Sequence, residues 1–369
     1  MKRKRGFFLL KPVACGLLAA AVNAHGADAV CDAAGCVSVK RFSDAVTQRL
    51  AGRVAGFVSI IGDEAPRIVE MGEARTAADP PRRRMAADVP VNVASVSKLL
   101  TAIAVLQALR ARHLGIDAPV AGWLPADWRR GPNIETITFR DLLTHRAGFR
   151  NDSDLTSYAD LRRQIADGVA LADKRKVVYN NKNFALFRVI LPYLNGFEDA
   201  APERRDAATA RAYIEYMQKH VFEPLGIEHA DCKPSAADPP ALYYPVPAGP
   251  ARGIEAGDWT PICGGGGWVL TANDLFRVMH SLLHDETLLA VPQKERLMKY
   301  CLGLGCSTRP QKDFRGKDGF LFYDGKKVAV EAFAGIFKGR MIAVVVTNSN
   351  PGPGITDIVQ DAFAAARIP

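Results

Sequence analysis

A serine and a lysine stand three residues apart in an apolar run of this 369-residue chain. The run reads VNVASVSKLLTA over residues 91–102, and the pair is Ser95 and Lys98. Helix positions i and i+3 lie on one face, so the two side chains can touch. Serine needs a neighbouring base to act as a nucleophile, and a lysine among apolar neighbours can be that base because burial lowers its pKa. The simpler interpretation, a helix N-cap followed by a solvated lysine, remains open from this stretch alone.

A second polar cluster occurs in VVYNNKNFAL, residues 177–186. It places Tyr179 and Asn181 two positions apart at the start of a predicted helix. A tyrosine phenol can take or relay a proton, and an amide can hold a substrate carbonyl. The alternative is a polar loop with one half-buried tyrosine.

A third cluster is FRGKDGF, residues 314–320, where Lys317 and Gly319 stand at the start of a predicted strand. Glycine in a strand lets another backbone or a ligand approach closely. A strand N–H beside it could form an oxyanion hole together with the N–H of Ser95. Taken alone, Lys317-Asp318-Gly319 is more typical of a turn.

The elements that must position these clusters come from both ends of the chain. A helix at 38–50 precedes strands at 56–62 and 66–72, joined by a turn at Asp63-Glu64, and Ser95 opens a helix that runs to about Arg112. Near the other end, a helix at 272–283 and three β-rich runs at 319–325, 326–337 and 340–348 precede a final helix at 355–367. This pattern predicts an α+β fold, with one antiparallel sheet built from both chain ends and flanked by helices.

The middle of the chain is mainly helical or loop in pattern. Helical segments are expected at 139–149, 161–170, 183–194 and 210–222, and residues 196–209 are expected to form an exposed connection. Residues 234–261 contain seven prolines and predict a long surface loop. The α/β part is therefore expected over about 38–112 and 262–369, with a helical insertion over about 113–261.

The N-terminus differs in composition from the rest of the chain. Four basic residues at positions 2–5 precede an apolar stretch that ends in small residues, which is the layout of a secretory signal. Cleavage after Ala24 or Ala29 would leave a domain over about 30–369 that is exported to the periplasm or secreted. Lys11-Pro12 interrupts the apolar stretch, so an uncleaved membrane anchor is the alternative.

The remaining composition is that of a globular protein, with 48% hydrophobic and 24% charged residues. Its basic residues are scattered and lack interleaved stacking aromatics, so nucleic-acid binding is not expected. The sequence does not indicate an oligomeric state.

Six cysteines follow the predicted signal, and an oxidising compartment favours their pairing. Two pairs share a five-residue offset, and the other two cysteines flank the proline-rich loop. The predicted disulfides are Cys31–Cys36, Cys232–Cys263 and Cys301–Cys306. The chain has no C-x-x-C and its histidines are not spaced as ligands, so no metal site is expected.

The three clusters, in this order, resemble the S-x-x-K, Y-x-N and K-T-G or H-x-G motifs of the serine β-lactamase and penicillin-binding-protein superfamily. Segments 137–149, 220–230 and 264–283 are also similar to segments of its class C branch, which includes D,D-carboxypeptidases, D-aminopeptidases and esterases. The resemblance extends over about residues 40–365 and implies a β-lactamase/transpeptidase-like fold.

The resemblance implies a role for each matching residue. Ser95 would be acylated, Lys98 would help to take its proton, and Tyr179 would pass the proton to the leaving group. The substrate-binding residues would be Asn181, which orients the substrate, Lys317 and Gly319, which line the strand side of the cleft, and Phe320, whose N–H would join that of Ser95 in the oxyanion hole. No metal or organic cofactor is implied, and the expected substrate is a small molecule or peptide, cell-wall fragments included.

The third motif departs from the family pattern. Asp318 stands where β-lactamases carry threonine or serine, and Phe320 stands where a small polar residue is usual. Both would disfavour the carboxylate of penicillins and peptidoglycan stems. This favours an esterase or a D,D-peptidase or D-aminopeptidase-like activity over a true class C-like β-lactamase. A different class of function, a catalytically weak envelope protein that binds peptidoglycan fragments or a partner, also remains open.

Two other stretches that could carry chemistry are better explained by structural roles. His145, in LLTHRAG, is expected to lie in a structural turn. The run Gly264 to Gly267 lacks the following Lys-Ser/Thr of a phosphate cradle, and the resemblance implies a tight loop beside the cleft. The chain has no G-x-S-x-G, so an α/β-hydrolase is not supported.

Overall fold

The computed structural model describes residues 29–32, 35–149, 156–174, 176–198, 200–307, 314–323, 328–338 and 340–368. The predicted signal over residues 1–29 lies outside this description except for Ala29.

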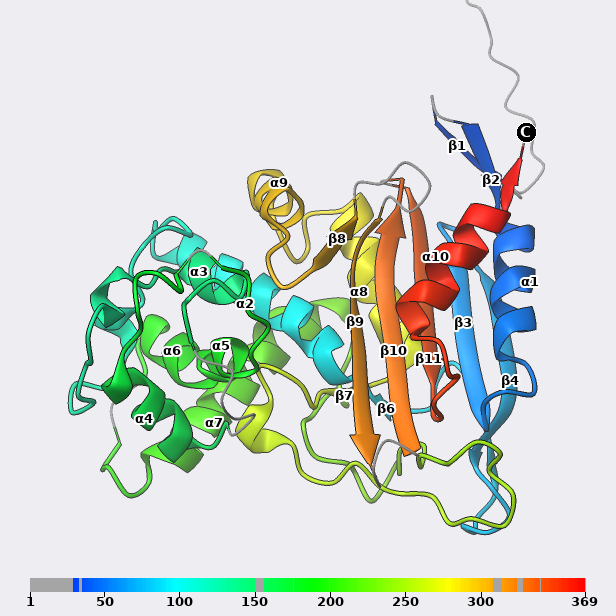
Figure 1. Cartoon of the computed structure of the whole chain (residues 1–369), viewed down its shortest axis with the longest axis horizontal. Coiled ribbons are helices and arrows are strands. Elements are labelled where there is room, and N and C mark those ends of the chain that lie inside the picture. Colours follow the sequence, from blue (N-terminus) through cyan, green and yellow to red (C-terminus); the bar gives the residue numbers. More distant parts are fainter. Residues whose placement is uncertain are drawn as a thin grey trace, which may run out of the picture.

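A seven-stranded antiparallel sheet forms the centre of the α/β part, in the order β5-β4-β3-β11-β10-β9-β8 (Figure 1). Three strands come from the N-terminal part of the chain: β3 (Gly56–Gly62), β4 (Arg67–Arg75) and β5 (Arg83–Arg84). Four come from the C-terminal part: β8 (Gly305–Ser307), β9 (Phe314–Tyr323), β10 (Val328–Phe337) and β11 (Met341–Thr347). Pairing of β11 with β3 joins the two groups, which confirms the predicted α+β fold.

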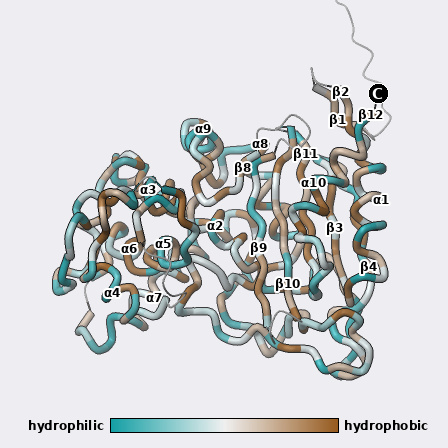
Figure 2. The backbone as a smooth tube through the Cα atoms, in the orientation of Figure 1, coloured by the Kyte–Doolittle hydropathy of each residue, from teal (hydrophilic) through white to brown (hydrophobic). Residues whose placement is uncertain are grey.

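Helices cover both faces of this sheet because its central strands are apolar on both sides. Every residue of β3, β10 and β11 is buried, and Figure 2 shows hydrophobic residues along these strands. Helices α1 (Val39–Leu50) and α10 (Ile355–Ala365) pack on one face through Phe42, Phe337 and Phe363. Helix α8 (Ala272–His284) packs on the other face, against β3, β10 and β11.

Helix α2 (Ser97–Ala111) lies between the sheet and the mostly helical region (Figure 1). The short 3₁₀ turn η1 (Ala94–Val96) precedes it. Together they form a stretch long and apolar enough to cross a membrane, but 78% of it is buried inside the protein, as in the core helix of a globular domain. This burial places polar side chains of α2 in the interior.

The helical region contains α3 (Phe139–Leu143), α4 (Tyr158–Asp167), α5 (Lys182–Ala185), α6 (Phe187–Leu194) and α7 (Arg205–Met217). A π turn (Gln218–Phe222) and a 3₁₀ turn (Glu223–Leu225) extend α7, and further 3₁₀ turns occur at Ala121–Trp123, Ile134–Thr136 and Thr260–Ile262. Helix α7 begins inside the predicted connection 196–209, so the prediction of a connection is wrong for residues 205–209. Helix α9 (Val291–Tyr300) was not predicted.

Two small sheets complete the fold. Strands β1 (Ala29–Asp32), β2 (Gly35–Ser38) and β12 (Arg367–Ile368) bring the described ends of the chain together, and β6 (Val91–Asn92) pairs with β7 (Val269–Leu270). These strands have two to four residues, too few for an alternating pattern to show.

All three predicted disulfides are present in the structure. Cys31–Cys36 joins β1 to β2, Cys232–Cys263 joins the two ends of the proline-rich segment, and Cys301–Cys306 joins the end of α9 to β8. Three disulfides are expected of a chain that folds in an oxidising environment.

The proline-rich segment is a loop, as predicted, but its middle is not at the surface. Tyr243 and Tyr244 are fully buried. The Tyr243 hydroxyl accepts a bond from the N–H of Asn92 (3.0 Å), and the Tyr244 hydroxyl accepts one from the N–H of Thr76 (2.9 Å). These bonds fix the loop against the strands that lead to α2, and the pattern of prolines could not reveal them.

Candidate active site

Ser95 and Lys98 occupy the 3₁₀ turn and the first turn of α2. The N-cap and solvated-lysine interpretation is wrong, because Ser95 makes no capping bond and Lys98 is 0% exposed. The Lys98 Nζ atom lies 3.0 Å from the Ser95 Oγ atom. A buried amine therefore faces a partly exposed hydroxyl.

Two fixed acceptors orient the Lys98 amine. Its Nζ atom lies 2.9 Å from Asn181 Oδ1 and 2.5 Å from the carbonyl oxygen of Gly265. A neutral amine has two N–H bonds and one lone pair. When the two N–H bonds donate to these oxygens, the lone pair points at the Ser95 hydroxyl, as a general base requires.

Burial holds the pKa of Lys98 well below its usual range, and the positive charge of Lys317 lowers it further. The carboxylate of Asp318 acts in the opposite direction but is the weaker influence. The net effect favours a neutral amine, which can take the Ser95 proton.

Tyr179 lies on the solvent side of the same hydroxyl. Its Oη atom is 2.7 Å from Ser95 Oγ, and its side chain is 46% exposed. The Nζ atoms of Lys98 and Lys317 lie 5.0 and 5.6 Å from the centre of its ring. The phenol is thus within proton-transfer distance of Ser95 and open to an incoming substrate.

His145 supports the segment that carries Tyr179. Its ring lies 4.4 Å from the Tyr179 ring, its carbonyl accepts the N–H of Val178, and its Nδ1 accepts the N–H of Asn180 at 3.3 Å. Burial, with the charges of Lys98 and Lys317, lowers the pKa of His145 to about 3. The imidazole therefore stays neutral and positions this segment, in agreement with its structural interpretation.

Strand β9 forms the other wall of the site and passes very close to η1. A Cβ atom built at Gly319 would lie 2.5 Å from both the N of Ser95 and the carbonyl oxygen of Val93. Only glycine fits this approach, as its position in the sequence suggested. The motif lies inside β9, which begins at Phe314, so the turn interpretation and the predicted strand start at 319 are wrong.

Replacing Gly319 with alanine is expected to reduce turnover about 100-fold, because the added methyl group must push β9 away from Ser95. Gly122→Ala is the control: Gly122 lies exposed in the 3₁₀ turn Ala121–Trp123, and its added Cβ would meet no atom within 4 Å. Steady-state kinetics with an ester substrate measures both variants. Full activity of Gly319→Ala would refute the role of this close approach.

Lys317 and Asp318 form an ion pair on β9, with Nζ and Oδ1 2.8 Å apart. Burial raises the pKa of Asp318, but the charge and hydrogen bond of Lys317 outweigh it, so the pKa is lowered. Asp318 is therefore ionised at neutral pH and offsets part of the positive charge that Lys317 offers to a ligand.

An open cavity of about 460 Å³ adjoins the candidate site. Tyr179 and Lys317 line it, together with His145, Arg146, Tyr300 and the Cys301–Cys306 disulfide. The cavity can hold the part of a substrate that extends beyond Ser95.

The site thus brings together Ser95, Lys98, Tyr179, Asn181, Lys317 and Gly319, with Phe320 exposed next to them on β9. The fold and this constellation define a β-lactamase-type serine-lysine-tyrosine site. The sequence model of the beta-lactamase family matches residues 42–366. The chain therefore belongs to the beta-lactamase family.

The curated relatives include one protein named as a putative penicillin-binding protein and two named as esterases. The chain is 26% identical to "Putative penicillin-binding protein PbpX" of Bacillus subtilis, over 52% of this chain and 46% of that protein. It is 25% identical to esterase EstB of Burkholderia gladioli (62% and 65% covered) and 27% identical to lovastatin esterase of Penicillium rubens (54% and 56% covered). The matches span about half to two thirds of the length of these relatives.

Solved structures share the fold at low identity. A penicillin-binding protein homologue from Pyrococcus abyssi aligns with a TM-score of 0.68 and 19% identity, over 88% of this chain and 76% of that chain. A beta-lactamase/D-alanine carboxypeptidase from Yersinia pestis aligns with a TM-score of 0.66 and 13% identity, over 88% and 96%. These alignments support the predicted β-lactamase/transpeptidase-like fold.

Proposed function

We propose that this protein is a serine hydrolase that cleaves an ester or amide bond through an acyl-enzyme on Ser95. The observation that carries the proposal is the convergence of two proton-transfer groups on one hydroxyl. Lys98 Nζ and Tyr179 Oη lie 3.0 and 2.7 Å from Ser95 Oγ. A serine placed in this way can be deprotonated as it attacks a carbonyl carbon.

The proposed reaction has two stages. Ser95 Oγ attacks the carbonyl while its proton passes to Lys98, and the N–H groups of Ser95 and Phe320 stabilise the oxyanion. Tyr179 then donates a proton to the departing alcohol or amine, which leaves an ester on Ser95. Water attacks that ester with the proton transfers reversed, which releases the acid and restores the hydroxyl.

An ester of low charge is the favoured substrate class. Asp318 offsets the charge of Lys317, which disfavours a substrate carboxylate at this wall. Phe320 and Phe322 are 51% and 37% exposed, with ring centres 4.9 Å apart, and offer an apolar surface on β9. Two of the curated relatives are named as esterases, which agrees with this preference.

A D,D-peptidase-like, D-aminopeptidase-like or β-lactamase activity is the second candidate, supported by the relative named as a penicillin-binding protein. The purified protein is to be incubated with a fluorophosphonate probe, a fluorescent penicillin and a short-chain nitrophenyl ester. Ester turnover with weak penicillin labelling is expected. A folded protein that reacts with none of the three would refute the hydrolase and favour the catalytically weak envelope protein.

Replacing Asp318 with threonine is expected to increase penicillin labelling about tenfold, because the change removes a negative charge and supplies a hydroxyl for the carboxylate. Asp318→Asn separates the two effects, since it removes the charge without adding the hydroxyl. The initial rate of labelling is the measurement. An unchanged rate in both variants would show that Asp318 does not set this preference.

We also propose that the protein is exported to the periplasm or secreted. Three disulfides and a basic, then apolar, N-terminus support this location. Contact with the membrane is proposed only for a chain whose N-terminal segment stays uncleaved. Cell fractionation and N-terminal sequencing of the mature protein would test both points.

A further inference from the structure

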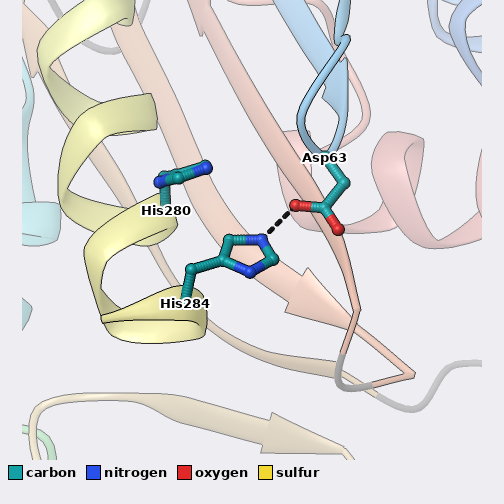
Figure 3. Close-up of side chains that lie close together, drawn as sticks. All are labelled: Asp63, His280 and His284. Carbon is teal, nitrogen blue, oxygen red and sulfur yellow. Dashed lines mark hydrogen bonds and ion pairs between the residues drawn. The ribbon is translucent and has the colours of Figure 1, made fainter. Parts of the chain in front are cut away.

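A cluster of two histidines and one aspartate lies outside the catalytic contacts (Figure 3). Asp63 follows β3 in the turn toward β4, whereas His280 and His284 stand four residues apart on α8. One ligand atom from each of the three side chains lies within 4.8 Å of the other two. Residues from distant parts of the sequence therefore present two imidazole nitrogens and a carboxylate oxygen to one point.

We propose that Asp63, His280 and His284 form a binding site for a divalent transition-metal ion, with Zn²⁺ as the ion of best fit. Two imidazoles and one carboxylate are a ligand set that zinc accepts, whereas calcium and magnesium prefer oxygen ligands. Tetrahedral coordination with bonds of about 2.0–2.1 Å sets the donor atoms about 3.3 Å apart. The three donor atoms lie within 4.8 Å of one another, so binding would require the side chains to rotate toward the ion.

The placement and exposure of the three side chains support metal binding. His280 and His284 lie at positions i and i+4 on one helix face, with their ring centres 4.5 Å apart, so the statement from the sequence that the histidines are not spaced as ligands is wrong for this pair. The side chains of Asp63 and His284 are 25% and 32% exposed, so an ion can enter from solvent and keep a water as its fourth ligand.

The simpler interpretation of the cluster is an ion pair between His284 and Asp63, which already share a hydrogen bond. It assigns no role to His280, although this residue offers a third donor atom at the same point. A bound ion would replace the hydrogen bond and connect α8 to the β3–β4 turn. Because α8 packs on β3 and β11, the expected effect is on stability rather than on the chemical step.

The test uses untagged full-length protein, freed of metal with a chelator and titrated with ZnCl₂ by calorimetry. One Zn²⁺ per chain is expected, with a rise in melting temperature of about 4 °C at a hundredfold excess over Kd. Co²⁺ in place of Zn²⁺ is expected to give the visible absorption bands of tetrahedral coordination.

Three variants assign the binding to this cluster. His280→Ala is the decisive one, since it leaves the His284–Asp63 pair intact yet is expected to weaken Zn²⁺ binding at least tenfold; Asp63→Asn is expected to do the same. His220→Ala, which removes an exposed histidine elsewhere, is the control and is expected to bind as the unchanged protein does. Absence of binding, or binding unaffected by His280→Ala, would overturn the proposal.

Discussion

Ester turnover is expected to fall at least about 10,000-fold when Ser95 is replaced by alanine, because no other group can then form the acyl-enzyme. The fold is expected to be unaffected. The Ser95 side chain makes its contacts with Lys98 and Tyr179, and it caps no helix. Steady-state kinetics and thermal unfolding, measured on the same preparation, give the two quantities.

Covalent labelling identifies the acylated atom. The fluorophosphonate adduct of the unchanged protein is expected on the peptide that contains Ser95, and heat-denatured protein, which lacks the assembled site, is the negative control. Equal labelling of Ser95→Ala and the unchanged protein would refute the nucleophile assignment, as would an adduct on another serine.

Replacing Lys98 with methionine is expected to slow acylation about 1,000-fold, since the variant has no base for the Ser95 proton. Methionine is apolar and similar in length, so it fills the buried space without an amine to desolvate. Its melting temperature is therefore expected to stay close to that of the unchanged protein. The rate of fluorophosphonate labelling measures acylation directly.

The pH dependence of acylation gives an independent check. Lys98 acts as a base only when neutral, so the rate is expected to rise as pH increases through its lowered pKa and then to level off. Lys98→Arg is expected not to restore activity, because a guanidinium remains protonated throughout. An active Lys98→Arg variant would show that the residue acts through its charge and not as a base.

Most of the fold could be predicted because its main elements carry strong periodic patterns. The apolar strands β3, β10 and β11 and the amphipathic helices α1 and α8 were predicted close to their observed bounds. The short strands were not predicted because two to four residues are too few to show a periodic pattern. Helix α9 was not predicted because only two of its residues are buried, so its apolar face is narrow. The start of β9 was placed too late, since Asp318 and Gly319 are also turn-forming residues.

The polar side chains of the site could be predicted because each belongs to a short motif with a chemical rationale. The groups that hold these side chains in place could not be predicted. The carbonyl oxygen of Gly265 that orients Lys98 is a backbone atom, and any residue type could supply it. The support that His145 gives to Tyr179 is a packing relation between segments more than 30 residues apart, and the Asp63 cluster depends on a contact between α8 and the turn after β3, 221 residues apart in the sequence.

The pairing of β11 with β3 joins two parts of the candidate site that lie far apart in the sequence. The segment that carries Ser95 is synthesised early, whereas β9, the strand that faces it, is synthesised late. Strand β9 pairs with β10, β10 pairs with β11, and β11 pairs with β3. A chain that still lacks β11 has no strand that joins β9 and β10 to β3, although β9 also contacts the turn of Ser95 directly. We therefore expect the site to be complete only when almost the entire chain has been synthesised.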